Sequence, residues 1–233
     1  MLQRLSPTQS PQDLPPGRLV LWETGEGLCL AMTGPQAPHP IRVDFGAGRL
    51  AFRRSRGGSE ALVKAVRGSQ KGTLRVLDAT GGLGTDAFLL ACHGMKVTML
   101  EKDPNLCLLL QDGLERAKAL PRLKNILEVL HLVQTDSLVF LEELPPGRFD
   151  VVYLDPMFPE RGGAALPGKE MQILRRLLSD PPPPDEEKVL LERARRAVKR
   201  VVVKRPKNAP PLGGIPAPFQ RMGKRCRFDL YVS

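Results

Sequence analysis

No apolar run in the 233 residues approaches the roughly 20 residues that a membrane-spanning helix needs. The first 17 residues, MLQRLSPTQSPQDLPPG, have no continuous apolar core and no small-residue cleavage site, so we do not expect a signal peptide. They are polar and rich in proline, which predicts a flexible N-terminal tail over residues 1–17. The sequence shows no internal repeat. We therefore expect a cytoplasmic protein with no membrane partner.

Cysteine is scarce as well. The four cysteines, Cys29, Cys92, Cys107 and Cys226, are scattered, with no CxxC pair and no metal-ligand spacing. This distribution predicts reduced thiols and neither a disulfide nor a metal site. No Ser/His or Cys/His pair is placed to form a covalent intermediate.

Acidic residues are almost absent from two segments of a chain whose net charge is +10 and whose isoelectric point is about 9.8. Residues 188–227 hold 13 Lys and Arg against the single acid Glu192, and residues 49–75 hold 8 against Glu60. Solvated helix faces account for part of this charge. They do not explain why both segments flank the same central region, so we expect a polyanionic partner.

The region from residue 18 to residue 70 predicts a small β-rich module. RLVLWE and GLCLAM alternate like the strands of a short hairpin, and IRVDFGAGRLAFRR predicts a second hairpin with GAG as its turn. SEALVKAV has apolar residues at helical spacing after Ser59, a plausible N-cap.

Strands and helices alternate from residue 71 to residue 233. The expected strands are RVLDA, KVTMLE, LEVLHLVQTD, FDVVYLD, RVVVKRP and RFDLYVS. Their apolar runs are typical of a parallel sheet covered on both faces. The alternation predicts an α/β, Rossmann-like domain with a doubly wound parallel sheet.

Ligands of such a sheet bind outside the carboxyl ends of the strands. Glycines there let the backbone pass close to a ligand, and the following helix offers its first N–H groups. Glu101 ends the second strand and can accept both hydroxyls of a ribose, while Asp136 and Ser137 are placed to touch an adenine edge. The candidates at the strand ends are Asp78, Gly81, Gly82, Gly84, Glu101, Asp136, Ser137 and Asp155.

The glycine loop alone leaves three interpretations open. A loop followed by a ribose-binding acid occurs in both dinucleotide and S-adenosylmethionine sites. GGLGTDA also fits the loose GxGxxA pattern of nicotinamide dehydrogenases, and a tight turn without any ligand is the third possibility.

The stretch YLDPMFP, residues 153–159, narrows the choice. Proline stops a strand, so the chain turns a rigid corner here. The corner either only redirects the chain or carries the residues of a binding site. It resembles the Asp-Pro-Pro-Tyr/Phe signature of methyltransferases that act on exocyclic amines of bases, with Met157 in the third position. Such an amine is a poor nucleophile. The Asp155 carboxylate and the Pro156 carbonyl can accept its two N–H groups and favour the developing positive charge, and Phe158 can stack on the base.

Six segments together resemble the RsmJ (YhiQ) family of bacterial small-subunit (16S) ribosomal RNA guanine-N2 methyltransferases. They are DATGGLGTDAF, LEKDP, VVYLDPMFP, KEM, RVVVKRP and RFDLY, and the resemblance covers about residues 41–233. It implies a class I S-adenosylmethionine-dependent methyltransferase fold and S-adenosylmethionine as cofactor. It also implies small-subunit ribosomal RNA or the 30S particle as partner, with a single guanosine near the RNA 3′ end as target.

The resemblance also implies individual contacts. Family members can carry Arg at positions 85 and 102 and a small hydroxyl residue at position 136, where this chain has Thr85, Lys102 and Asp136. The implied cofactor contacts are Thr85, Asp86, Glu101, Lys102, Asp136, Ser137 and Asp155. For RNA phosphates we expect Lys204 and Arg205 close to the site and Arg53, Arg54 and Arg56 further away.

Two other functions are alternatives to the methyltransferase. A non-catalytic RNA-binding or ribosome assembly factor could retain a cofactor fold, but the intact Asp155 argues against it. A nicotinamide dehydrogenase would lack both the Asp-Pro-x-Phe corner and an antiparallel RFDLYVS strand beside RVVVKRP.

Overall fold

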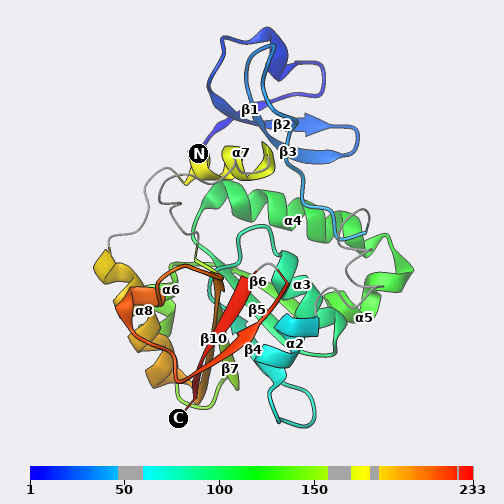
Figure 1. Ribbon diagram of the computed structural model, residues 1–233. Helices are drawn as coiled ribbons and strands as arrows, with labels where there is room; N and C mark the ends of the chain where they lie inside the picture. The colour runs from blue at the N-terminus through cyan, green and yellow to red at the C-terminus, as the bar shows by residue number, and fades with distance from the viewer. Residues whose placement is uncertain (47–59, 157–168, 179–183, 225, 233) are drawn as a thin grey trace.

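The computed structural model describes residues 1–46, 60–156, 169–178, 184–224 and 226–232 (Figure 1). A small sheet contains β1 (Gln3–Leu5), β2 (Leu19–Thr24) and β3 (Gly27–Met32). The large sheet contains β4 (Arg75–Asp78), β5 (Lys96–Glu101), β6 (Leu130–Gln134), β7 (Val151–Leu154), β8 (Arg200–Pro206), β9 (Phe219–Met222) and β10 (Cys226–Val232). The helices are α2 (Glu60–Arg67), α3 (Thr85–Cys92), α4 (Pro104–Lys118), α5 (Lys124–Leu127), α6 (Ser137–Glu142), α7 (Lys169–Leu177) and α8 (Pro184–Ala197).

The large sheet has the strand order β6-β5-β4-β7-β8-β10-β9. Neighbours from β6 to β8 pair in parallel, whereas β10 pairs antiparallel with both β8 and β9. The order reverses between β4 and β7, which is the switch point where open α/β sheets bind ligands. The predicted α/β fold and the predicted antiparallel last strand are confirmed.

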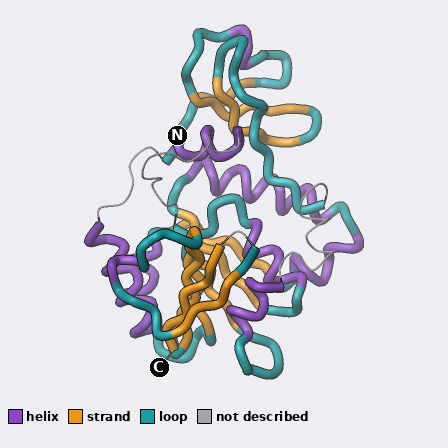
Figure 2. Tube along the Cα trace, in the orientation of Figure 1, coloured by secondary structure: helices purple, strands orange, loops and turns teal. Residues whose placement is uncertain are grey.

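Helices lie on both faces of the large sheet (Figure 2). Side chains alternate along a strand, so Val76 and Tyr153 pack into one core with α2, α3 and α4. Leu77 and Val152 pack into the other core with α6 and α8. This explains the continuous apolar runs in the strand sequences. No helix in the described ranges is long and apolar enough to cross a membrane.

The N-terminal tail that we predicted to be flexible is ordered in the structure. Residues 3–5 form β1, which pairs in parallel with β2, and Leu5 is fully buried. The backbone N–H of Leu2 donates to Asn105 Oδ1 of α4 at 3.0 Å. Composition did not reveal this strand, because its order depends on a partner strand and on a single buried leucine.

The first predicted hairpin is confirmed, since β2 and β3 pair antiparallel around a turn between Thr24 and Gly27. The second predicted hairpin, which begins at Ile41, is not a hairpin in its described part. Residues 41–46 form no strand and only one isolated bridge, from Ile41 to Leu30. The remainder of that hairpin and the predicted cap Ser59 lie outside the described residues.

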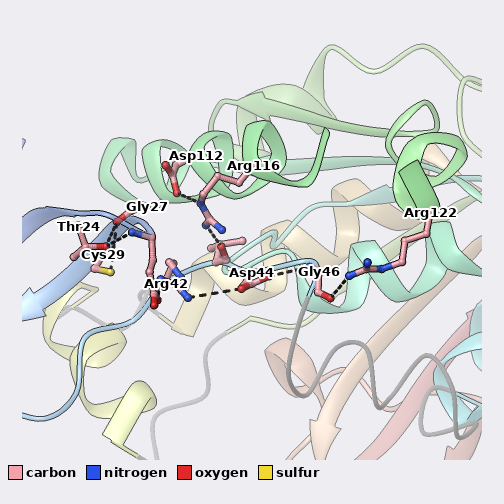
Figure 3. A network of polar contacts seen from close by, with 11 residues as sticks. Thr24, Gly27, Cys29, Arg42, Asp44, Gly46, Asp112, Arg116 and Arg122 are labelled. Atoms are coloured by element: carbon pink, nitrogen blue, oxygen red, sulfur yellow. Dashed lines mark hydrogen bonds and ion pairs between the residues drawn. The ribbon is translucent and has the colours of Figure 1, made fainter. Parts of the chain in front are cut away.

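Residues 41–46, here called the connecting segment, tie the small sheet to the large domain (Figure 3). Arg116 of α4 donates to Val43 O, and Arg122 Nη2 donates to Gly46 O at 2.8 Å. A Cβ at Gly113 would lie 2.6 Å from Val43 Cγ1, so α4 approaches this segment as closely as glycine permits. Phe45 then packs against Phe88 of α3, with 5.0 Å between the ring centroids. The small sheet and the large domain therefore share one core.

Candidate active site

The predicted cofactor residues at the strand ends meet at the carboxyl edge of the large sheet, because β4, β5, β6 and β7 are parallel. The glycine loop, residues 81–84, packs at this edge against β5, α4 and Phe45. Gly81 N donates to Leu100 O at 2.8 Å, and a Cβ at Gly84 (φ 71°) would lie 2.9 Å from Leu110 Cδ2 and 3.2 Å from Phe45 Cζ. These two glycines are thus required by close packing of the loop.

Gly82 differs from the other two glycines of the loop, Gly81 and Gly84, because its backbone has open space beside it. Its φ is 55°, and a Cβ there would have only Thr80 O, at 3.8 Å, within 4 Å. The backbone is therefore open to a ligand at this point. Gly82 N donates to Glu101 Oε2 at 2.9 Å, and Asp103 N donates to Glu101 Oε1 at 2.9 Å. Burial raises the pKa of Glu101, while these two N–H groups oppose the increase.

Asp78 and Asp155 are linked through Thr80. Thr80 N donates to Asp78 Oδ1 at 3.0 Å, and the Asp155 N–H donates to Thr80 Oγ1 at 2.6 Å. The corner after β7 is thus fixed to the end of β4 across the switch point. Asp78 is 2% exposed, and its burial, together with the charges of Asp86 and Asp155, raises its pKa to about 7.

Lys204 joins two carboxylates at the same edge. Its Nζ lies 2.6 Å from Asp155 Oδ2 and 2.7 Å from Asp86 Oδ2. Tyr153 Oη donates to Asp86 Oδ2 at 2.7 Å. We call Lys204, Asp86, Asp155 and Tyr153 the Lys204 network. None of the described residues donates a hydrogen bond to Asp155 Oδ1, and the Asp155 side chain is 37% exposed, so a ligand can reach it.

The charges of the Lys204 network have opposing effects. Burial disfavours the ammonium group of Lys204, but Asp155 and Asp86 outweigh burial and raise its pKa. Burial raises the pKa of Asp155, while the charge of Lys204 and its hydrogen bond lower it. Lys204 thus pairs with Asp86 and Asp155, and the charges of these two carboxylates also act on Asp78. This concentration of acidic groups favours a cationic ligand.

The other predicted cofactor residues lie around this edge in different roles. Asp136 caps α6 by accepting from Leu138 N at 2.7 Å, and Ser137 Oγ donates to Ala79 O at the end of β4. Thr85 is the first residue of α3. Lys102 is exposed, and its Nζ lies 3.8 Å from Glu186 Oε1. Their contacts to a cofactor stay predictions.

Residues predicted to touch RNA or a base are placed only in part. Phe158, Arg53, Arg54 and Arg56 lie outside the described residues, whereas Pro156 directly follows Asp155 and is half-buried. Lys204 is engaged in its network. Arg205 is 1% exposed, and its Nε donates to Pro210 O at 3.1 Å. The structure thus gives both cations protein partners, and their contact with phosphates stays a prediction.

Sequence reasoning missed Thr80 and Tyr153. Thr80 lies two residues after Asp78, a spacing that permits a side-chain-to-backbone turn, and this signal was available. Tyr153 interrupts an aliphatic strand with a hydroxyl that must find a partner when buried. Among the described residues, no group of three or more His, Cys, Asp or Glu side chains could hold a metal ion.

Comparison with known proteins gives consistent matches over most of the chain. A family model described as "Putative SAM-dependent methyltransferase" matches residues 11–233. The ribosomal RNA small subunit methyltransferase J of Thioalkalivibrio sulfidiphilus is 46% identical over 220 residues, which cover 92% of this chain and 85% of that protein. The protein of the same name from Marinobacter nauticus is 42% identical over 217 residues, 91% of this chain and 77% of that protein.

A solved structure also resembles this chain. The SAM-dependent methyltransferase NGO1261 from Neisseria gonorrhoeae has a TM-score of 0.72 and 33% sequence identity, covering 94% of this chain and 85% of that one. The similarity extends over both the small sheet and the large domain, because so little of the chain is left out.

Proposed function

We propose that this chain, which belongs to the S-adenosylmethionine-dependent methyltransferase family of ribosomal RNA small subunit methyltransferase J, methylates the N2 amine of one guanosine in 16S ribosomal RNA. One observation carries the choice of an amine as target. Asp155 stands at the switch point, fixed by Thr80 through its backbone and by Lys204 through Oδ2, with Oδ1 directed at no described donor.

The residues at the carboxyl edge fit S-adenosylmethionine. Gly82 leaves its backbone open, and each Glu101 oxygen accepts one backbone N–H and keeps a lone pair for a ribose hydroxyl. The carboxylates of Asp78, Asp86 and Asp155 suit the sulfonium and ammonium charges of the cofactor. Bound S-adenosylmethionine supplies an activated methyl group, which the amine nitrogen accepts.

Asp155 supports the reaction by orientation. The lone pair of the guanine amine is delocalised into the ring, so the nitrogen needs help to present it to the methyl group. A carboxylate that accepts one amine N–H fixes the nitrogen and stabilises the positive charge that develops on it. The amine is too weak an acid to lose its proton first, so the proton leaves with or after methyl transfer. Burial raises the pKa of Asp155, and Lys204 opposes this increase, so Lys204 favours the ionised carboxylate that this task needs.

The test is methyl transfer from labelled cofactor to protein-free small-subunit ribosomal RNA, followed by digestion to nucleosides and mass analysis. We expect a single product, N2-methylguanosine, at one position. Methylation of an adenine amine, a ring carbon or a ribose would contradict the proposal while leaving the family assignment intact.

A further inference from the structure

The two basic segments of the chain meet in the fold. The helix α2 belongs to the first segment and packs against β9 and β10 of the second. Arg200 of β8 donates from Nε and Nη2 to Ala65 O of α2 at 3.1 and 2.8 Å. Burial and then the nearby charge of Arg221 lower the pKa of Arg200, so these two cations lie close together. The second segment thus carries the cations Arg200 and Arg221 where it meets α2 of the first segment.

The strand β9 exposes all four of its residues. Phe219 is 62% exposed and Met222 is 58% exposed, so β9 presents two large apolar side chains to the solvent. Phe219 pairs with Leu230 and Arg221 pairs with Phe228, so both side chains point to the face that α2 covers. An exposed aromatic ring beside cations is the arrangement on which bases of single-stranded nucleic acids stack.

The carboxyl end of β9 lies at the same sheet edge as Asp155. Met222 is opposite Arg227, which is opposite Arg205, the residue after Lys204. Three strand spacings separate β7 from β9, a distance of about 14 Å. This edge is therefore close enough to bind nucleotides next to a base held at Asp155.

The loop after β8 is fixed at this edge. Arg227 pairs with Asp229 at 2.8 Å and also donates from Nη1 to Pro206 O and Lys207 O at 3.1 and 2.6 Å. Lys207 itself is exposed, as is Lys224 in the turn between β9 and β10.

We propose that Lys207, Phe219, Arg221, Met222 and Lys224, here called the β9 surface, bind the unpaired RNA that flanks the target guanosine. This inference rests on the proposed function. Residues 193–228 hold 12 Lys and Arg and no acid, whereas residues 1–46 hold three Arg, no Lys and four acids. This charge distribution favours attraction of RNA to the C-terminal part of the large domain, which includes β9, rather than to the small N-terminal sheet.

The experiment measures binding of fluorescent, protein-free small-subunit RNA by anisotropy over a range of salt concentrations. The double variant Arg221→Glu/Lys224→Glu should bind at least tenfold more weakly, with a log–log salt slope reduced by about 1.4, since each phosphate contact of a single strand contributes about 0.7. Phe219→Ala should weaken binding about tenfold with an unchanged slope, because stacking involves no counterion release.

The matched control is Lys96→Glu/Arg148→Glu, which reverses two exposed charges at the amino ends of β5 and β7, the opposite edge of the sheet. It should change RNA affinity less than threefold. Equal losses in both double variants would show unspecific attraction and overturn the proposal.

Two further measurements distinguish a failure of the β9 proposal from a failure of the proposed methyltransferase function. Cofactor affinity, followed by calorimetry, should be unchanged in all β9 variants. If these variants bind free RNA like the wild type but fail on assembled 30S particles, the β9 surface contacts a ribosomal protein and the proposal is wrong. If the wild type transfers no methyl group to either substrate, the proposed function fails, whereas the RNA-binding comparison still decides on the β9 surface.

Discussion

Replacing Lys204 by Met should move the pH dependence of methyl transfer. The substitution removes the ammonium that lies 2.6 Å from Asp155 Oδ2 and 2.7 Å from Asp86 Oδ2, and it keeps the length of the apolar stem. Burial and the remaining charge of Asp86 then both favour the protonated form of Asp155. A protonated Asp155 has lost the acceptor charge that orients the amine.

The size of the effect follows from the geometry. An opposite charge within a few ångströms commonly lowers a carboxyl pKa by about one to three units. Because 37% of the Asp155 side chain is exposed and solvent screens the pair, we expect the lower half of that range. The acid limb of the rate profile should therefore move up by about one to two pH units.

The assay is the single-turnover rate from pH 5 to pH 9 with saturating RNA and cofactor. The ratio of wild-type to Lys204→Met rates should be largest at the acid end and shrink towards pH 9, while Lys204→Arg should keep the wild-type profile. Loss of these ion pairs also destabilises the fold, by less than the about 3–5 kcal/mol of fully buried pairs because Lys204 and Asp155 are partly exposed. Lys204→Gln therefore serves as a second neutral variant if the Met variant does not fold. A rate reduced by one constant factor at every pH would refute the charge argument and leave Lys204 a purely structural role.

Three further outcomes test the cofactor pocket and the docking of the small sheet. Glu101→Ala should weaken S-adenosylmethionine binding at least tenfold in calorimetry and spare RNA binding, whereas Glu115→Ala on the exposed side of α4 should change neither; equal cofactor affinity would exclude Glu101 as the ribose acceptor. Because burial raises the pKa of Asp78 to about 7 and a cationic ligand lowers it again, cofactor binding near pH 7 should release protons, seen as buffer-dependent binding heats, and Asp78→Asn should abolish this release. Gly113→Ala should lower the free energy of unfolding in urea by about 1–3 kcal/mol, although alanine favours a helix by about 1 kcal/mol, because its Cβ would lie 2.9 Å from Val43 O; unchanged stability would contradict the close docking.

The sequence predicted those helices and strands in which apolar residues recur at a regular spacing. The strands of the large sheet are buried on both faces and the helices have an apolar stripe, so their patterns stand out locally. β9 was missed because all four residues of FQRM are exposed, and its only signal is its pairing with β10. β1 was missed for a similar reason, since only Leu5 of its three residues is buried.

The sequence could predict which residues of the candidate site lie at the strand ends. It could not predict the contacts of the Lys204 network. Asp78, Glu101 and Asp155 each follow an apolar run, and parallel pairing alone brings them to one edge. The partner of Lys204 depends on β8 lying next to β7, which no local pattern reveals. Sequence reasoning therefore assigned this lysine to RNA by charge, whereas the structure shows it joined to two carboxylates.

The single-turnover rate of Asp155→Asn is the most direct test of Asp155 as the acceptor that orients the guanine amine. The substitution keeps the shape of the side chain and replaces one acceptor oxygen by a donor that faces the guanine amine. We expect a loss of about 100-fold or more in rate, with RNA and cofactor affinities within a few-fold of the wild type. Asp150→Asn is the matched control, because Asp150 precedes the same strand at its amino end, paired with Arg75 at 2.7 Å, and its variant should react at the wild-type rate. An Asp155→Asn protein that methylates guanosine as fast as the wild type would show that YLDPMFP is only a structural corner.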